Sequence, residues 1–231
     1  MRGLNRKARR DSARPMVNSI NPDVVCLQGT KKEAISGRMV ISMLGSDFDQ
    51  FVVLPADGTR GGILLAWRGG VCHALSSRID NFSVSVHFES EEGPSWWFTG
   101  VYGPQQDDQK IMFLQELHNI RQDCQGPWAI GGDFNLIYMA EDKNNANVNR
   151  AMMGWFRHFL DDMELNEIPL LGRKFTWSND RVTPTLVRLD RVFMAADREQ
   201  VIPDCVLQSA ASMISDHCPL ILGLMENIQG K

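Results

Sequence analysis

Short apolar runs alternate along the chain with a few amphipathic stretches, and the two patterns predict different elements. A continuous apolar run such as Val24–Leu27 is typical of a strand that is buried on both faces. Phe82–Phe88 alternates apolar and polar residues, as a strand with one buried face does. Strands are therefore predicted at Val24–Leu27, Phe51–Leu54, Gly62–Trp67, Phe82–Phe88, Trp96–Tyr102, Trp128–Gly131, Phe175–Ser178, Leu189–Phe193, Val206–Ser209 and Pro219–Leu224.

Three stretches carry apolar residues at helical spacing: 7–20, with Pro15 inside it, Asp107–Asp123 and 149–163. Strands outnumber these helices, and several strands are joined by short connections. The pattern therefore predicts an α+β fold, a four-layer sandwich of two packed mixed sheets with outer helices. A doubly wound parallel sheet is the alternative. We found no repeat or linker-like stretch, so a single domain over residues 1–231 is expected.

Charge and cysteine usage narrow the class of protein only slightly. The chain has 231 residues, 24 of them Lys or Arg and 28 Asp or Glu, so its net charge is −4 and exerts no global pull on nucleic acid or membrane. A local basic rim could still bind DNA. The odd number of cysteines and the lack of a CxxC pair predict reduced thiols, an intracellular location and no disulfide-linked partner.

Membrane and secretory signals are not evident. No apolar run approaches the roughly 18 residues of a membrane-spanning helix, so no membrane partner is expected. The basic start MRGLNRKARR has no apolar core and is read either as a nuclear address or as a solvated helix start.

Polar residues that could carry chemistry gather at the ends of predicted strands. Asp133 and Asn135 follow a buried strand and point the same way, because residues two apart on an extended segment share a side. Asp216 and His217 come just before another apolar strand, and histidine titrates near neutral pH. Each pair also has a structural reading, as a turn cap or a satisfied ion pair.

Two further clusters have the same position relative to strands. Asp190 lies between arginines in RLDRVF, where a salt-bridged strand edge is the structural reading, and Tyr102 ends a strand in VYGP. The chain carries neither a P-loop nor a Ser/His/Asp nucleophile motif. Hard oxygen ligands together with a histidine fit Mg²⁺-assisted hydrolysis of phosphate esters.

Taken together, these motifs make the chain resemble the endonuclease/exonuclease/phosphatase (DNase I-like) superfamily, and within it the apurinic-endonuclease-like domain of plant LINE-type (non-LTR) retrotransposons. GDFN followed by SDH is specific to the superfamily, and FTWSN followed by RLDR points to the retrotransposon branch. The matching segments are Arg2–Asn5, Pro22–Lys32 (PDVVCLQGTKK), Gly61–Gly62, Val101–Pro104 (VYGP), Gly132–Asn135 (GDFN), Phe175–Asn179 (FTWSN), Arg188–Phe193 (RLDRVF) and Ser215–Pro219 (SDHCP).

The resemblance implies a catalytic role for five residues. Asp133 would activate the attacking water, Asn135 would hold that water and the phosphate, and Tyr102 would contact a phosphate oxygen. His217 would stabilise the charge that grows on the phosphate, oriented by Asp190.

The resemblance also implies contacts to a metal ion and to the substrate. Mg²⁺ or Mn²⁺ would be held by Asp133, Asn135 and Asp216. A DNA strand would be contacted by Thr176, Trp177, Asn179 and Arg191.

Two departures from the family pattern predict an impaired enzyme. Gly29 stands where the family has its metal-binding glutamate, so weak metal binding is expected. The strand with which the family begins is missing before Met1, which predicts an N-terminally truncated domain. The leading interpretation is a metal-dependent phosphodiesterase that nicks DNA in the nucleus. The alternatives are an inactive transposon-derived remnant that at most binds nucleic acid and, ranked last, a small-molecule phosphatase.

Overall fold

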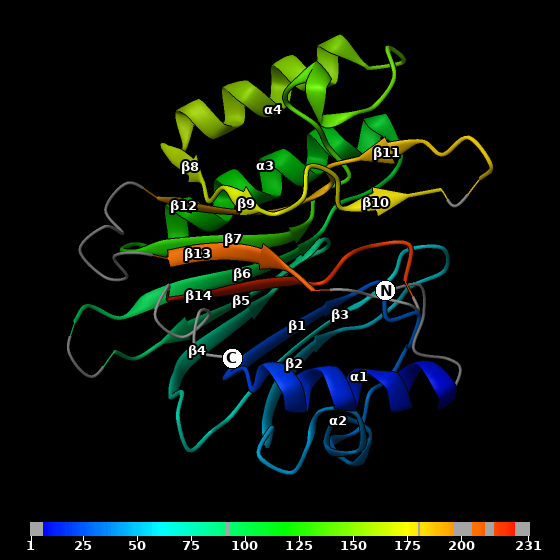
Figure 1. Ribbon diagram of the computed structural model, residues 1–231. Helices are drawn as coiled ribbons and strands as arrows, with labels where there is room; N and C mark the ends of the chain where they lie inside the picture. Colours follow the sequence, from blue (N-terminus) through cyan, green and yellow to red (C-terminus); the bar gives the residue numbers. More distant parts are fainter. Residues whose placement is uncertain (1–6, 91–92, 180, 196–204, 211–214, 225–231) are drawn as a thin grey trace. The chain divides into compact units, whose positions relative to one another are not determined.

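The computed structural model describes residues 7–90, 93–179, 181–195, 205–210 and 215–224 (Figure 1). The chain divides into two compact units, Met1–Tyr102 and Gly103–Lys231. Each unit contains helices and strands and is described by itself. Among the described residues, no helix has the length and apolar character needed to cross a membrane.

The N-terminal unit packs helices on a sheet and that sheet on a second one (Figure 1). The first sheet has the order β1-β3-β2, and the second contains the antiparallel meander β4-β5-β6. The elements are α1 (Lys7–Ile20), β1 (Val24–Gln28), α2 (Gly37–Leu44), β2 (Gln50–Leu54), β3 (Ile63–Trp67), β4 (Ala74–Ile79), β5 (Ser83–Phe88) and β6 (Trp96–Tyr102).

Strand β3 explains why this unit forms layers. Its residues are buried without exception, and they alternate between two cores. Leu64 and Ala66 pack with Val40 of α2, whereas Ile63 and Leu65 pack with residues of β5 such as Val86. A continuous apolar run can satisfy both faces only as a central strand. The sequence pattern predicted a strand here, but it predicted two-sided burial for Val24–Leu27, whose strand β1 is only partly buried.

The C-terminal unit is also built of helices and sheets. Strand β12 pairs antiparallel with β7 and with β8, the sheet β14-β13-β9 contains the parallel pair β13–β9, and β10 and β11 form a hairpin. The elements are α3 (Asp107–Asp123), β7 (Trp128–Asp133), η1 (Ala140–Asp142), α4 (Arg150–Asp162), β8 (Leu165–Glu167), β9 (Leu170–Leu171), β10 (Trp177–Ser178), β11 (Leu186–Val187), β12 (Asp190–Ala195), β13 (Cys205–Ser209) and β14 (Leu220–Leu224).

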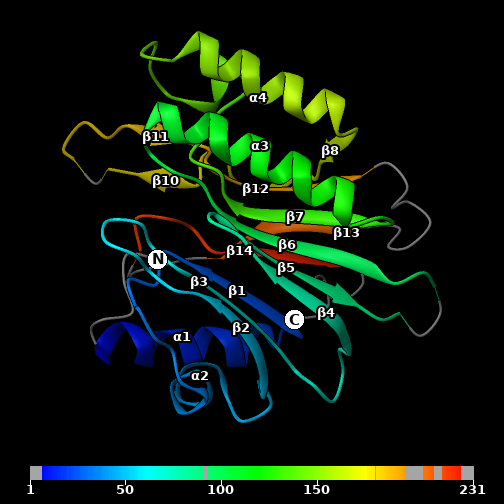
Figure 2. The same ribbon diagram turned by 180° about the vertical axis from the view of Figure 1, so that it is seen from behind.

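An aromatic cluster joins helices to strands in this unit. α3 and α4 lie on one side of β7 and β12 (Figure 2). Phe134 comes just after β7. Its ring centroid lies 6.2 Å from that of Phe113 in α3, 5.5 Å from that of Phe156 in α4 and 5.2 Å from that of Phe193 in β12. This packing fixes the chain directly beside Asp133.

The predicted α+β class is confirmed, and the doubly wound parallel alternative is wrong because the described sheets are antiparallel or mixed. Two elements of the N-terminal unit were not predicted, α2 and β4. The single-domain organisation and the missing first strand stay predictions.

Candidate active site

Two facing strands bring the first two carboxylates together. Asp133 ends β7, Asp190 begins β12, and the two residues are directly opposite each other in the antiparallel ladder. Side chains at opposite positions lie on the same face, with Cβ atoms about 5 Å apart. Both residues are buried, with Asp133 4% and Asp190 8% exposed. Two acids thus share one small volume with little water.

His217 lies between these carboxylates. Its Nδ1 is 2.8 Å from Oδ2 and 3.1 Å from Oδ1 of Asp190, and its Nε2 is 3.7 Å from Oδ2 of Asp133. The segment that carries His217 is held by β10 through a bridge to Trp177. The convergence of Asp133, Asp190 and His217, which their positions near strand ends predicted, is therefore present in the structure.

Asn135 orients the carboxylate of Asp133. Its backbone is in the left-handed region, with φ 50°, which asparagine tolerates better than most residues. This turn lets its backbone N–H donate to Oδ1 of Asp133 at 3.0 Å, while its side-chain Nδ2 donates to the carbonyl of Gly103 at 2.7 Å and to Oδ2 of Asp133 at 3.3 Å. A Cβ at Gly103 would lie 2.1 Å from the carbonyl oxygen of Phe134, so this close approach requires glycine.

Burial and neighbouring charges shift both titrating groups toward their protonated forms. Burial, and then the charge of Asp190, raise the pKa of Asp133 to about 7, against the lowering influence of His217 and the Asn135 N–H. Burial lowers the pKa of His217, but the hydrogen bond and charge of Asp190 and the charge of Asp133 outweigh it, so its pKa lies above the usual value. Both shifts favour the protonated forms of Asp133 and His217.

The same three residues form a possible metal site. Asp133, Asp190 and His217 offer ligand atoms that all lie within 4.8 Å of one another. Two buried carboxylates that face each other are a suitable environment for a cation, so Asp133 and Asp190 fit a divalent metal. Among the described residues, Asp216 is not part of this group, and its Oδ2 accepts a hydrogen bond from Nε1 of Trp177 at 3.1 Å. Its role as a metal ligand stays a prediction.

One residue predicted to contact substrate, Thr176, holds the site together instead. Thr176 is fully buried, and its Oγ1 accepts hydrogen bonds from the N–H groups of Leu189 and Asp190, each at 3.0 Å. Its carbonyl accepts from the N–H of Cys218 at 2.8 Å. Thr176 thus links the strand of Asp190 to the segment of His217, and its assignment as a direct DNA contact is corrected.

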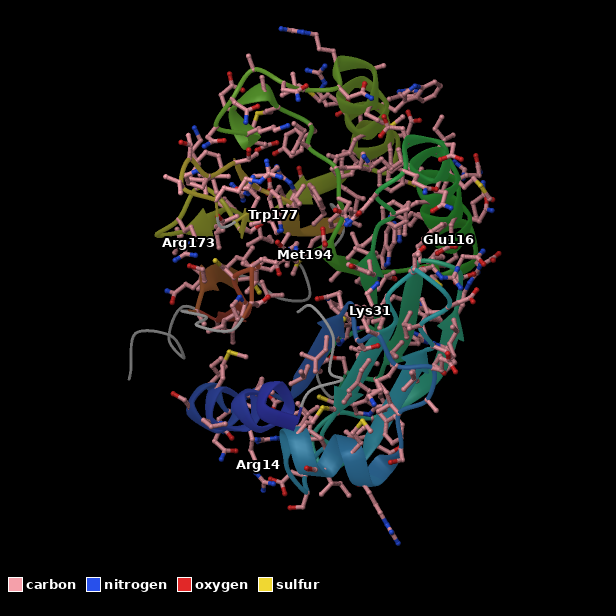
Figure 3. The ribbon with its side chains drawn as sticks, turned by 90° about the vertical axis from the view of Figure 1, so that its right-hand side faces the viewer. Arg14, Lys31, Glu116, Arg173, Trp177 and Met194 are labelled. Carbon is pink, nitrogen blue, oxygen red and sulfur yellow. The ribbon has the colours of Figure 1, made fainter. Side chains whose placement is uncertain are left out.

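Trp177 and Asn179 belong to the β10–β11 hairpin. Figure 3 shows Trp177 and Arg173 on neighbouring parts of the C-terminal unit. Trp177 is half-buried and binds Asp216, so it positions a residue of the SDH motif. Oδ1 of Asn179 accepts from the N–H of Thr185 at 2.9 Å and so closes the hairpin. A contact of either residue with DNA stays a prediction.

The prediction for Arg191 is wrong. Its side chain is fully buried, and its guanidinium lies 2.5 Å from Oδ2 of Asp142 and 2.6 Å from Oε1 of Glu167. A guanidinium that is enclosed by two carboxylates cannot reach a DNA strand. Asp142 and Glu167 had no distinguishing signal in the sequence, because neither lies in a family motif.

Tyr102 and Gly29 belong to the N-terminal unit, where Gly61 brings them together. A Cβ at Gly61 would lie 2.6 Å from the ring of Tyr102 and 2.7 Å from the Cα of Gly29, so glycine allows this close contact. Gly29 itself has φ 67°. The catalytic role of Tyr102 and the lost metal ligand at Gly29 stay predictions.

Comparisons with known proteins identify the family and the fold. Residues 1–217 match the model of the endonuclease/exonuclease/phosphatase family. The fold is similar to the AP endonuclease LMAP from Leishmania major, with TM-score 0.69 and 17% identity over 93% of this chain and 81% of that one. It is equally similar to the endonuclease domain of TRAS1, a telomere-specific non-LTR retrotransposon, with TM-score 0.69 and 14% identity over 96% and 95% of the two chains.

A third similar structure is D. rerio TDP2 in complex with a single-strand DNA product, with TM-score 0.61 and 15% identity over 94% of this chain and 91% of that one. No curated protein matches the sequence at a significant level. At such identities the structural likeness establishes the fold, and the family model establishes the membership. The chain therefore belongs to the endonuclease/exonuclease/phosphatase family.

Proposed function

We propose that the chain is a metal-dependent phosphodiesterase of endonuclease type that nicks DNA by attack of water on a backbone phosphate. The observation that carries this proposal is the imidazole of His217 between two buried carboxylates, with Nδ1 2.8 Å from Asp190 and Nε2 3.7 Å from Asp133. This arrangement places a proton donor, His217, next to a proton acceptor, Asp133, as hydrolysis of a phosphodiester requires.

His217 would act on the phosphate. Asp190 occupies Nδ1 and favours the cationic imidazole, so Nε2–H is the donor that remains for a phosphoryl oxygen. A donor held in place before the reaction stabilises the charge that develops in the transition state without reorganising.

Asp133 would act on the water. Its pKa of about 7 makes it a suitable proton acceptor near neutral pH, and the N–H and Nδ2 of Asn135 hold its carboxylate in one orientation. A bound Mg²⁺ or Mn²⁺ would add a Lewis acid that neutralises phosphate charge. Asp133, with Asp190 and His217 beside it, is the part of the described site that fits such an ion.

DNA as the substrate is supported by the solved neighbours, which include two endonucleases and a TDP2 bound to a DNA product. The FTWSN and RLDR segments favour the retrotransposon branch, in which DNA nicking in the nucleus is the expected activity. Gly29, which offers no carboxylate at the position of the family's metal ligand, favours weak metal binding and a slow reaction.

Gly29 also favours a second candidate, an inactive remnant that at most binds nucleic acid. The two candidates are separated by conversion of supercoiled plasmid to nicked circles with Mg²⁺ or Mn²⁺. The comparison covers the chain as it stands, Gly29→Glu and His217→Ala. The proposed enzyme gives slow nicking that rises in Gly29→Glu and vanishes in His217→Ala. Plasmid that stays intact with the first two chains, while salt-sensitive DNA binding is retained, supports the remnant.

A further inference from the structure

Arg188 and Arg191 flank Asp190 in the sequence, and both side chains contact Glu167. Nη2 of Arg188 lies 2.7 Å and Nη1 of Arg191 lies 2.6 Å from Oε1 of Glu167. Glu167 ends β8 and pairs with β12 at Phe193, three residues beyond Asp190. One carboxylate oxygen thus holds the chain on both sides of the residue that binds His217.

The surroundings of this carboxylate are closed and balanced in charge. Arg191 also binds Asp142 at 2.5 Å, and its guanidinium carbon lies 4.6 Å from the ring centroid of Tyr138. The hydroxyl of Tyr138 donates to Oε2 of Glu167. Arg188 and Arg191 match Glu167 and Asp142 in charge, and the four side chains are between 0% and 17% exposed. A neutral, enclosed network has no cation to offer to a DNA phosphate.

The network continues into the backbone around Asp190. The N–H of Arg188 donates to the carbonyl of Asp142 at 2.8 Å, and Nη2 of Arg191 donates to the carbonyl of Arg188 at 3.3 Å. Oδ2 of Asp142 in turn accepts from the N–H of Met139 at 3.1 Å. Backbone and side chains are therefore fixed on each side of Asp190, and the side chain of Arg191 lies on the face of β12 opposite to that of Asp190.

We propose that Glu167 is a positioning residue: through Arg188 and Arg191 it fixes the backbone on both sides of Asp190, and so the carboxylate that orients His217. This inference rests on the proposed function, because it assigns Glu167 to the same site. Residues that orient a catalytic group through one intervening partner commonly change activity by about 10- to 100-fold when they are replaced.

The test separates positioning from simple stabilisation with two variants. Glu167→Gln keeps the size of the side chain but leaves two buried arginines with one carboxylate. Glu167→Gln combined with Arg188→Met restores the balance of one cation and one anion, yet it no longer ties both sides of Asp190. Asp80→Asn is the matched control, because it removes a carboxylate 2.7 Å from Arg78, outside the catalytic group.

Three readouts are taken for each chain: the single-turnover rate of plasmid nicking with its KM, the melting temperature, and the downfield proton NMR signal of the His217 Nδ1–H. We expect Glu167→Gln to lower the melting temperature, to lower the rate about tenfold or more at unchanged KM and to shift or broaden the signal. The double variant recovers the melting temperature but neither the rate nor the signal. Asp80→Asn leaves the rate and the signal unchanged.

The outcomes distinguish this inference from the proposed function. Recovery of the rate and the signal together with the melting temperature in the double variant would overturn the positioning role and leave a structural one. An unchanged signal in Glu167→Gln would overturn it as well. If the unaltered chain does not nick DNA but the signal responds as described, the proposed function fails and the positioning of Asp190 by Glu167 stands.

Discussion

Nδ1 of His217 lies within hydrogen-bond distance of both carboxylate oxygens of Asp190, at 2.8 Å from Oδ2 and 3.1 Å from Oδ1. This contact decides which ring nitrogen is available for chemistry. Because Nδ1 is occupied, Nε2 is the nitrogen that faces Asp133, at 3.7 Å. The charge of Asp190 also contributes to the raised pKa of His217, so one contact sets both the direction and the charge of the imidazole.

Replacement of Asp190 by asparagine tests that contact. Asp190→Asn keeps the shape of the side chain but removes its charge, so we expect the pKa of His217 to fall below its value in the unaltered chain. The nicking rate should fall about a hundredfold, the lower end of what a positioned acid or base contributes. NMR titration of the imidazole and single-turnover nicking measure the two effects. An unchanged His217 pKa in a folded variant would contradict the role given to Asp190.

Thr176 is expected to matter for stability as well as geometry. Thr176→Val keeps the shape but removes the acceptor for the N–H groups of Leu189 and Asp190, and buried unpaired groups of this kind cost about 1–3 kcal/mol. Urea unfolding should show that Thr176→Val lowers the free energy of unfolding by an amount in that range. Thr176→Ser should retain most of the stability of the unaltered chain. Equal stability of the valine and threonine chains would exclude a structural need for the hydroxyl.

Without a bound metal, the free energy of unfolding of the chain should fall as the pH rises. The pKa of Asp133 is about 7 in the folded chain, against about 3.9 for an unfolded aspartate. The folded state therefore holds a proton that the unfolded state has released, and this contribution is present below about pH 4 and lost progressively up to about pH 7. The raised pKa of His217 acts in the same direction above about pH 6.5.

Melting temperatures measured between pH 4 and pH 8 in the presence of a chelator check this dependence. Asp133→Asn carries no titrating group at this position and serves as the control. The unaltered chain should lose stability relative to the control as the pH rises from about 4 to about 7. A constant difference between the two curves would show that Asp133 titrates normally.

Proton release should accompany metal binding, for the same reason. A divalent cation must displace the proton of Asp133, so the affinity for Mg²⁺ or Mn²⁺ should rise with pH and level off above about 7. Calorimetry at pH 6 in two buffers of different ionisation enthalpy counts the protons released. We expect nearly one proton per ion, and none in Asp133→Asn. Micromolar Mg²⁺ affinity in the unaltered chain would contradict the weak binding expected from Gly29.

The α+β class and the convergence of Asp133, Asp190 and His217 could be predicted from the sequence, because both depend on local patterns. The apolar run of β3 is buried on both faces, Asp133 and Asp190 lie at the ends of the buried strands β7 and β12, and His217 comes shortly before β14. Strand β4 was missed because five of its six residues are exposed, so its sequence carries no alternation of buried apolar and exposed polar residues.

Arg191 was misassigned although the sequence contained the information. Successive residues of a strand point to opposite faces, so if Asp190 faces the catalytic group, Arg191 must face away from it. Glu167 is different, because it meets Arg191 only through the pairing of β8 with β12, across 24 positions of the chain. Contacts of that kind depend on register and cannot be inferred from a single sequence.

The substitution Gly29→Glu should raise the nicking activity and lower the stability of the fold, and the two effects can be measured separately. A glutamate at this position would restore the family's carboxylate, and metal stabilisation of phosphate charge is worth several kcal/mol, so recovery of even half of it would raise nicking about a hundredfold. However, Gly29 has φ 67°, a left-handed conformation that costs a residue with a Cβ about 1 kcal/mol. We therefore expect faster nicking together with a lower melting temperature.

Gly29→Ala isolates the loss of stability, because it adds the Cβ without the carboxylate. It should have a lower melting temperature without faster nicking. Equal rates in all three chains would show that the missing glutamate does not limit this protein.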